Sequence, residues 1–133
     1  MFDFSNYVWS FCNTGVMAPP DYAKANPEIV YALVKSFEEA ERLVYSALAY
    51  ARKVARVEFS DMPGDVVDKA IDAEIKYEIL AHTVVTQDAE WNKLMEMQKF
   101  LGNVNGSVAM SEGIDNSFAD EAAREAQTVK APM

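Results

Sequence analysis

Residues 63–101 carry an apolar pattern long enough to decide the fold class. Apolar residues recur there at alternating steps of four and three, with breaks only at Gln87 and Gln98. This spacing places one continuous stripe along an α-helix of roughly 57 Å, at 1.5 Å per residue. We therefore predict one helix over 63–101. The members of this long row are Val66, Ala70, Ala73, Tyr77, Leu80, Val84, Trp91, Leu94 and Leu101.

A second apolar row runs beside the long row, from Val67 to Val85. A helix that is apolar on two sides is buried on two sides, so it needs two neighbours. One neighbour can come from this chain, and we expect the other to come from another chain. The predicted interface residues on this helix are Ile71, Ile75, Ile79 and Val85.

The preceding segment, 27–58, is also predicted to be helical. Asn26 is a good N-cap, Pro27 suits the first helical position, and Glu28 complements the helix dipole. A turn at 60–65 is so short that the two helices must be antiparallel neighbours. The apolar row of the first helix is Val30, Leu33, Phe37, Ala40, Val44, Ala47, Ala51 and Val54.

The two ends of the chain are predicted to flank this hairpin. Residues 1–26 form an aromatic arm with a short N-terminal helix, which either packs back on the bundle or docks on a neighbouring subunit. Residues 102–114 read as a linker and 115–129 as a weak, alanine-rich helix, so 102–133 is expected to be a flexible tail. The interface candidates in the arm are Phe4, Tyr7 and Trp9.

The expected architecture is therefore all-α. A long antiparallel helical hairpin occupies 27–101, and the surplus apolar faces favour an oligomeric bundle. The helix 63–101 could be interrupted near Thr83–Thr86, where Thr86 or Asp88 could cap a new start. Because the long row stays in phase across this point, we favour a continuous helix.

Charge and composition exclude several functional classes. A net charge of −9 over 133 residues argues against nucleic-acid binding, which needs a basic patch. No apolar stretch reaches the length of a membrane span. Cys12 is the lone cysteine, so no internal disulfide is possible, and the start of the chain does not resemble a secretory signal. We expect a cytoplasmic protein.

The titratable residues do not form a recognisable catalytic motif. In the predicted hairpin, Glu41 could approach Glu78 and His82, a faint likeness to a carboxylate metal site. Di-iron bundles, however, use Glu-x-x-His pairs on facing helices, whereas the spacing here is Glu78-x-x-x-His82. We therefore expect no catalytic residue, metal or cofactor. A metal- or nucleotide-handling helical bundle enzyme stays open as an alternative.

One family resemblance concerns the middle of the chain. An alanine-bearing helix, a short loop with a proline and a helix with spaced apolar residues resemble the small helical head–tail connector (adaptor) proteins of tailed bacteriophages. The resemblance implies a ring-forming virion protein that bridges a portal and a tail, with no catalytic residues. The residues concerned are Ala47, Ala51, Arg52, Pro63, Val67, Ala70, Ile71, Tyr77 and Glu78.

Taken together, these patterns predict a non-enzymatic structural or assembly protein that works through helix-mediated contacts with protein partners, including itself. A phage virion component is the most concrete form of this prediction, and such a protein would occur in the host cytoplasm and the virion. The alternative within the same class is an acidic regulatory or inhibitory binding protein.

Overall fold

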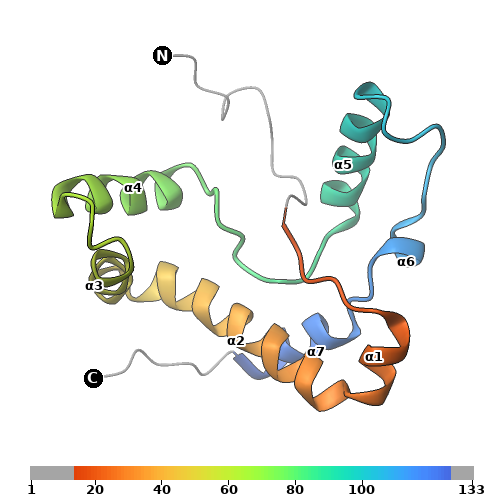
Figure 1. Cartoon of the computed structure of the whole chain (residues 1–133), viewed down its shortest axis with the longest axis horizontal. Helices are drawn as coiled ribbons and strands as arrows, with labels where there is room; N and C mark the ends of the chain where they lie inside the picture. The colour runs from red at the N-terminus through yellow and green to blue at the C-terminus, as the bar shows by residue number, and fades with distance from the viewer. Residues whose placement is uncertain (1–13, 127–133) are drawn as a thin grey trace.

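The computed structural model describes residues 14–126, and their regular secondary structure is entirely helical, as the sequence predicts (Figure 1). The helices in this part of the chain are α1 (Pro20–Ala25), α2 (Pro27–Ser46), α3 (Leu48–Glu58), α4 (Gly64–Lys76), α5 (Asp88–Phe100), α6 (Met110–Gly113) and α7 (Ser117–Glu125).

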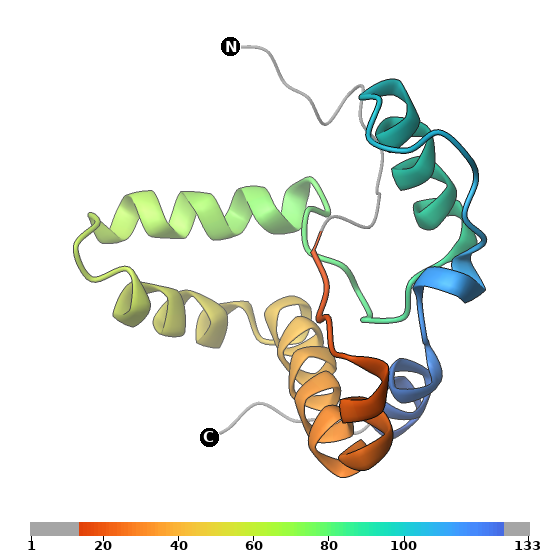
Figure 2. The ribbon, with the colours of Figure 1, turned by 45° about the vertical axis from the view of Figure 1, so that its right-hand side comes forward.

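The helices form three local groups around an open arrangement. α2 is the longest, and α7 lies along it while α1 packs at its N-terminal end. The α3–α4 hairpin extends to one side of α2, and the α5–α6 pair stands on the other side (Figures 1 and 2). An extended segment, 77–87, connects α4 to α5 across the middle.

The predicted helix over 27–58 begins and ends as expected, but it is divided at one residue. Ala47 has φ −137° and ψ 56°, which are not helical angles, and it separates α2 from α3. Asn26 stands at the predicted boundary, yet its side chain does not cap α2. Its Nδ2 donates instead to the carbonyl of Tyr22 at 3.0 Å, which closes α1.

The predicted continuous helix over 63–101 is wrong. α4 ends at Lys76, Glu78 takes a positive φ of 49°, and helical structure returns only at Asp88. The carboxylate of Glu90 accepts a hydrogen bond from the backbone N–H of Gln87 at 2.9 Å, which supports the new helix start. The interruption spans the Thr83–Thr86 stretch that the sequence marks as a possible break.

Side chains from other helices replace the backbone bonds that a continuous helix would make here. In a helix, the Val84 N–H would donate to the Leu80 carbonyl. The Val84 N–H instead donates to the Glu38 carboxylate at 2.8 Å, while the Leu80 carbonyl accepts from the Tyr45 hydroxyl. Asn116 pairs with both backbone groups of Thr86, at 3.2 and 2.8 Å. The extended segment is therefore well satisfied without helical bonds.

We expected the long row of α4 to contact the neighbouring helix of this chain and the second row to contact another chain. Within this chain, it is the second row that makes the contact. Val67, on the second row, is 3% exposed, whereas Val66, on the long row, is 41% exposed. α3 is the neighbour that α4 contacts, and buried Ala55 comes from that helix. The second row therefore faces α3 within this chain, and the long row faces outward. Arg56 to Asp68 and Arg52 to Asp72 ion pairs fix the antiparallel register.

The described part of the predicted flexible tail, residues 102–126, contains two helices that pack against the rest of the chain. α7 packs along α2 in the same chain, and Ala119, Ala122 and Ala126 are buried. Small side chains allow this close approach, because a larger residue would hold the two backbones apart. The predicted linker 102–114 contains α6, which α5 contacts. The indole N–H of buried Trp91 donates to the Val108 carbonyl at 2.9 Å.

Candidate functional site

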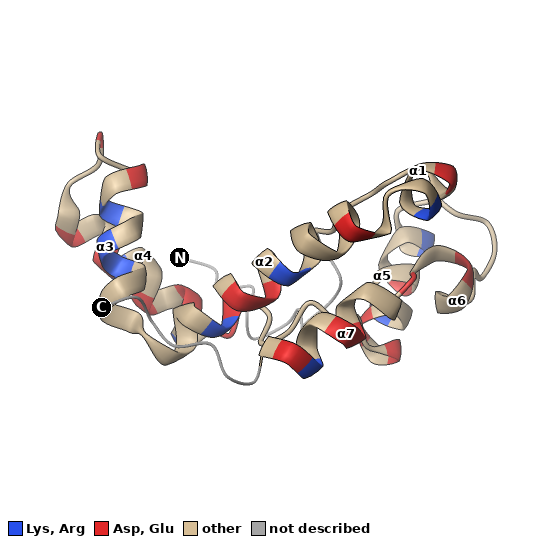
Figure 3. Ribbon diagram, turned by 90° about the horizontal axis from the view of Figure 1, so that it is seen from below, with Lys and Arg blue, Asp and Glu red and all other residues tan. Residues whose placement is uncertain are grey.

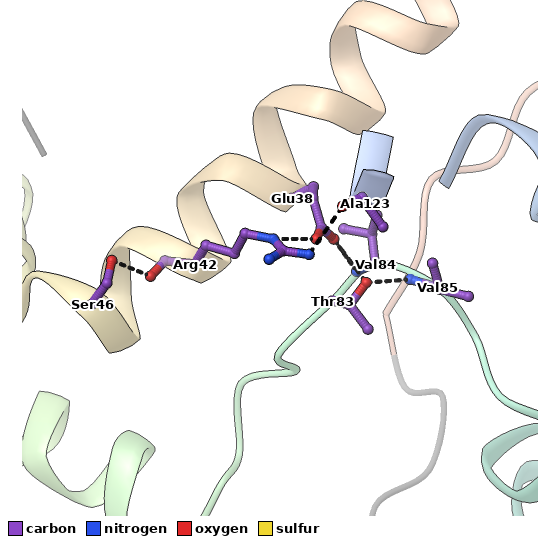
Figure 4. Close-up of polar contacts among 7 residues, drawn as sticks. All are labelled: Glu38, Arg42, Ser46, Thr83, Val84, Val85 and Ala123. Carbon is purple, nitrogen blue, oxygen red and sulfur yellow. Dashed lines mark hydrogen bonds and ion pairs between the residues drawn. The ribbon is translucent and has the colours of Figure 1, made fainter. Parts of the chain in front are cut away.

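α2 has two contrasting faces, and the inner one centres on Glu38. This side chain is fully buried, with 0% of its surface exposed. Its carboxylate accepts hydrogen bonds from Arg42 Nε at 2.6 Å, from Thr83 Oγ1 at 2.9 Å and from the Val84 N–H at 2.8 Å. Figure 4 shows Glu38 pointing from α2 toward Thr83 and Val84. These three donors compensate the cost of burying a charge.

Arg42 extends the same junction to the C-terminal helix. Its Nη2 donates to the carbonyl of Ala123 at 3.2 Å while its Nε pairs with Glu38 (Figure 4). One ion pair therefore joins α2, the segment 77–87 and α7. Because three segments share these bonds, we interpret the Glu38–Arg42 pair as the structural centre of the described fold.

Glu41 lies one turn from Glu38 and has a different environment. Its Oε2 is buried and has no hydrogen-bond partner within the described residues. Burial, followed by the nearby Glu38 carboxylate, raises the pKa of Glu41 from 4.5 to about 7. Glu41 is therefore a proton-binding group near neutral pH, without a neighbouring nucleophile in this part of the chain.

His82 and Tyr45 form the nearest candidate for chemistry. Their rings stack with centroids 3.9 Å apart, and His82 Nε2 lies 3.7 Å from Glu78 Oε1. His82 therefore contacts α2 at Tyr45, whereas the residue that the sequence predicted to approach Glu78 and His82 was Glu41. However, both the Glu78 and His82 side chains are largely exposed. Within residues 14–126, no group of three or more His, Cys, Asp or Glu residues could hold a metal ion.

The outer face of α2 differs from its inner face in composition, because its exposed side chains carry no charge. From position 29 to position 45, every exposed residue of α2 is uncharged, and every charged residue is at least partly buried. At 100° per residue, the exposed set covers an arc of about 140°. We call this set the outer face; its members are Ile29, Ala32, Leu33, Ser36, Phe37 and Ala40.

This arrangement inverts the usual polarity of a surface helix, which turns its charges to water and its apolar stripe inward. Ile29, Leu33 and Phe37 are 51%, 43% and 47% exposed. Figure 3 marks the charged positions of α2 and shows α7 alongside it. The charged side of α2 bonds α7 through Lys35 and Arg42, so the apolar outer face points away from this neighbour.

The α3–α4 hairpin presents a second exposed apolar surface. We call it the hairpin row, and it lies on both helices and their connecting turn. These side chains lie close together in the sequence, on the two helices that contact each other. Its members are Val54, Val57, Phe59, Met62 and Val66, with exposures from 41% to 66%.

The predicted interface residues are dispersed in the structure. Ile71 and Ile75 are partly buried on α4, and Val85 is partly buried in segment 77–87. Ile79 is 62% exposed. The other predicted interface residues, Phe4, Tyr7 and Trp9, lie outside the described residues.

Sequence reasoning missed the outer face because it placed Leu33, Phe37 and Ala40 in one apolar row with residues such as Val30 and Val44, which are partly buried. The available signal was the distribution of charge. All six charged residues of α2 lie within an arc of about 160°, which leaves the opposite arc without charge. A charge-free arc wider than one helical neighbour requires predicts a further contact.

Comparisons with family models, with curated proteins and with solved structures find no match to this chain. No helix in the described part of the chain combines the length and the apolar character that crossing a membrane requires.

Proposed function

We propose that this chain is a non-enzymatic assembly protein that works through helix-mediated protein–protein contacts. The observation that carries the proposal is the inverted polarity of α2 between positions 29 and 45, where every charged residue is at least partly buried while Ile29, Leu33 and Phe37 are exposed. Because these side chains are about half exposed, covering them completely would stabilise the protein by about 0.7–1.5 kcal/mol each. A partner that covers this face would recover that stabilisation.

The hairpin row supports the same proposal from a second element. Val57 is 66% exposed and Phe59 is 53% exposed. Val57 belongs to α3 and Phe59 follows α3 directly, and α3 lies on the opposite side of Figure 1 from α5 and α6. Two separate apolar faces allow one copy to contact more than one neighbour. This property is what a building block of a larger assembly needs.

A head–tail connector subunit is the most concrete form of the proposal, and it rests on the sequence resemblance over 47–78. In this form the protein is made in the host cytoplasm and incorporated in the virion as a ring. A head-to-tail ring requires two different contact faces on each copy, and the hairpin row would supply one of them.

The proposal is tested by measuring the mass of the purified chain by light scattering over a dilution series. We expect a species larger than the 14.8 kDa chain at high concentration, with a mass that falls on dilution. A chain that keeps its monomer mass at every concentration would contradict assembly from copies of this protein.

A further inference from the structure

Three residues of α2 line the junction between this helix and the extended segment that follows α4. Glu38, Glu41 and Tyr45 are spaced by three and four positions, so their side chains leave the same side of α2. The first and the last of them hold the segment. Glu38 accepts from the Val84 N–H at 2.8 Å, and the Tyr45 hydroxyl donates to the Leu80 carbonyl. Glu41 lies between these two attachment points.

Glu41 differs from its two neighbours because it makes no hydrogen bond at the junction. Its Oε2 is buried and has no hydrogen-bond partner within the described residues. Burial without a donor disfavours the charged form of a carboxyl far more than the neutral form. The position of Glu41 therefore favours a bound proton.

The carboxylates around Glu41 act in the same direction as burial. Glu38 lies one turn away, and its charge adds to burial in raising the pKa of Glu41 to about 7. More acidic groups lie near the next residue of the junction, Tyr45. Its pKa is raised by burial and then by three carboxylates, those of Glu78, Glu41 and Glu74. The junction is therefore rich in acidic groups.

The basic groups nearby are already paired. Arg42 Nε is bonded to the carboxylate of Glu38 at 2.6 Å, so it balances that charge rather than the charge of Glu41. On α7, which also packs against α2, Glu125 is paired with Lys35 at 2.6 Å, nearer to the start of α2. Ionisation of Glu41 thus adds a negative charge that no cation at the junction balances.

We propose that the protonation of Glu41 controls how firmly the extended segment is attached to α2. While Glu41 is neutral, the buried charge of Glu38 is balanced by Arg42, and the segment stays in place. When Glu41 loses its proton, a second negative charge lies one turn from the carboxylate that holds the Val84 N–H. Separation of the segment from α2 admits water to Glu41 and relieves this repulsion, so the segment separates more often.

This attachment affects more than the junction itself, because the extended segment joins α4 to α5. The α3–α4 hairpin and the α5–α6 pair lie on different sides of α2 (Figures 1 and 2). Loosening the segment allows these two groups to move relative to α2. The inference concerns the conformation of a single chain, so it goes beyond the proposed function and does not depend on it.

Amide hydrogen exchange of the Val84 N–H measures the attachment, because this amide exchanges when its bond to Glu38 opens. We expect its protection factor to fall about tenfold or more between pH 5 and pH 8, as Glu41 loses its proton. Glu41→Gln is neutral at both pH values and should abolish the fall. Glu39→Gln, on the same turn of α2, is the matched control and should leave the fall unchanged.

His82 is the other group at the junction that needs a control, because histidine changes its charge near neutral pH. Its ring stacks on Tyr45 with the centroids 3.9 Å apart, and its Nε2 lies 3.7 Å from Glu78 Oε1. His82→Asn should leave the fall in protection of the Val84 N–H in place. If His82→Asn abolishes the fall and Glu41→Gln does not, the pH response belongs to the histidine and the inference is overturned.

The remaining outcomes are equally decisive. A fall that is present in the parent and absent in Glu41→Gln alone supports the inference. A protection factor that is the same at pH 5 and pH 8 overturns it. So does a Val84 N–H that exchanges as slowly as the slowest amides of α2 at both pH values, because the segment then opens only when the whole chain unfolds. None of these results depends on the mass in solution that tests the proposed function.

Discussion

At the scale of single residues, Glu38 and its neighbours show how little a local pattern says about burial. Glu38, Glu39 and Glu41 look like the solvated face of a helix, yet Glu38 is fully buried and Glu41 is partly buried. The difference arises from Thr83, Val84 and Ala123, which are 45 to 85 positions away and supply or receive the hydrogen bonds of the Glu38–Arg42 pair. No short sequence window contains that information.

Removing the Glu38 carboxylate should be strongly destabilising. Glu38→Ala leaves Arg42 without its counter-ion and leaves the Val84 N–H without an acceptor, so we expect a loss of about 3–5 kcal/mol in the free energy of unfolding. Urea denaturation followed by circular dichroism measures this loss. Glu39→Ala is the matched control and should change the free energy by about 0.5 kcal/mol or less. Equal effects of the two variants would contradict the central role of Glu38.

Glu41 should make the stability of the protein depend on pH. Its pKa is about 7 in the folded protein and 4.5 ordinarily, so the unfolded chain ionises first as the pH rises. Stability is therefore lost between pH 4.5 and 7 and stays reduced above 7. Glu41→Gln removes this loss and should stabilise the protein by on the order of 1 kcal/mol at pH 8, allowing for partial exposure.

Measuring the free energy of unfolding at pH 8 and at pH 4 distinguishes an effect of Glu41 ionisation from a stabilisation that does not depend on pH. The Glu41→Gln variant and the parent should have nearly equal stability at pH 4, where the carboxyl is protonated in both states. Glu58→Gln, at an exposed position, should show no such pH-dependent difference. A constant advantage of Glu41→Gln at both pH values would mean that ionisation is not its cause.

At the scale of helices, the sequence predicts where helical segments lie more reliably than how far they extend. The start at Pro27 and the turn near 60–63 follow from the positions of the prolines, which act locally. The break at 77–87 is not local, because Glu38, Tyr45 and Asn116 take over the backbone bonds of Leu80, Val84 and Thr86. Apolar periodicity continues across the break, so periodicity alone could not reveal it.

Two neighbouring valines on α4 test which row faces α3. Val67→Ala should lower the free energy of unfolding by about 2 kcal/mol, because it creates a cavity in the contact with α3. Val66→Ala removes the same atoms from a side chain that is 41% exposed, and should cost about 0.5 kcal/mol or less in a dilute, monomeric sample. The reverse order would mean that the long row faces α3, as the sequence alone suggested.

At the scale of the whole molecule, the described chain leaves much of its apolar surface uncovered. Its buried apolar residues are Ala55, Val67, Trp91, Ala119, Ala122 and Ala126, and four of these six are alanines. Alanine contributes little burial, so the interior of one chain provides limited stabilisation. The outer face and the hairpin row hold the larger side chains. Association would therefore contribute part of the stability of each copy.

Because association would stabilise each copy, we expect the thermal midpoint of unfolding to change with protein concentration. For a dimer that unfolds and dissociates together, the midpoint should rise by roughly 2–3 °C for each tenfold increase in concentration. Circular dichroism melts over about a hundredfold range of concentration measure this rise. A midpoint independent of concentration in the parent would contradict linked association.

Sequence patterns alone predict the helical class, the start of α2, the turn between α3 and α4, and an excess of apolar surface for a chain of this length. Each of these features follows from local chemistry or from composition. Only the tertiary structure decided which apolar rows are covered, because that depends on which segments reach each face. α7 and the segment 77–87 bind the charged side of α2 through the Glu38–Arg42 pair, and their binding turns Ile29, Leu33 and Phe37 outward.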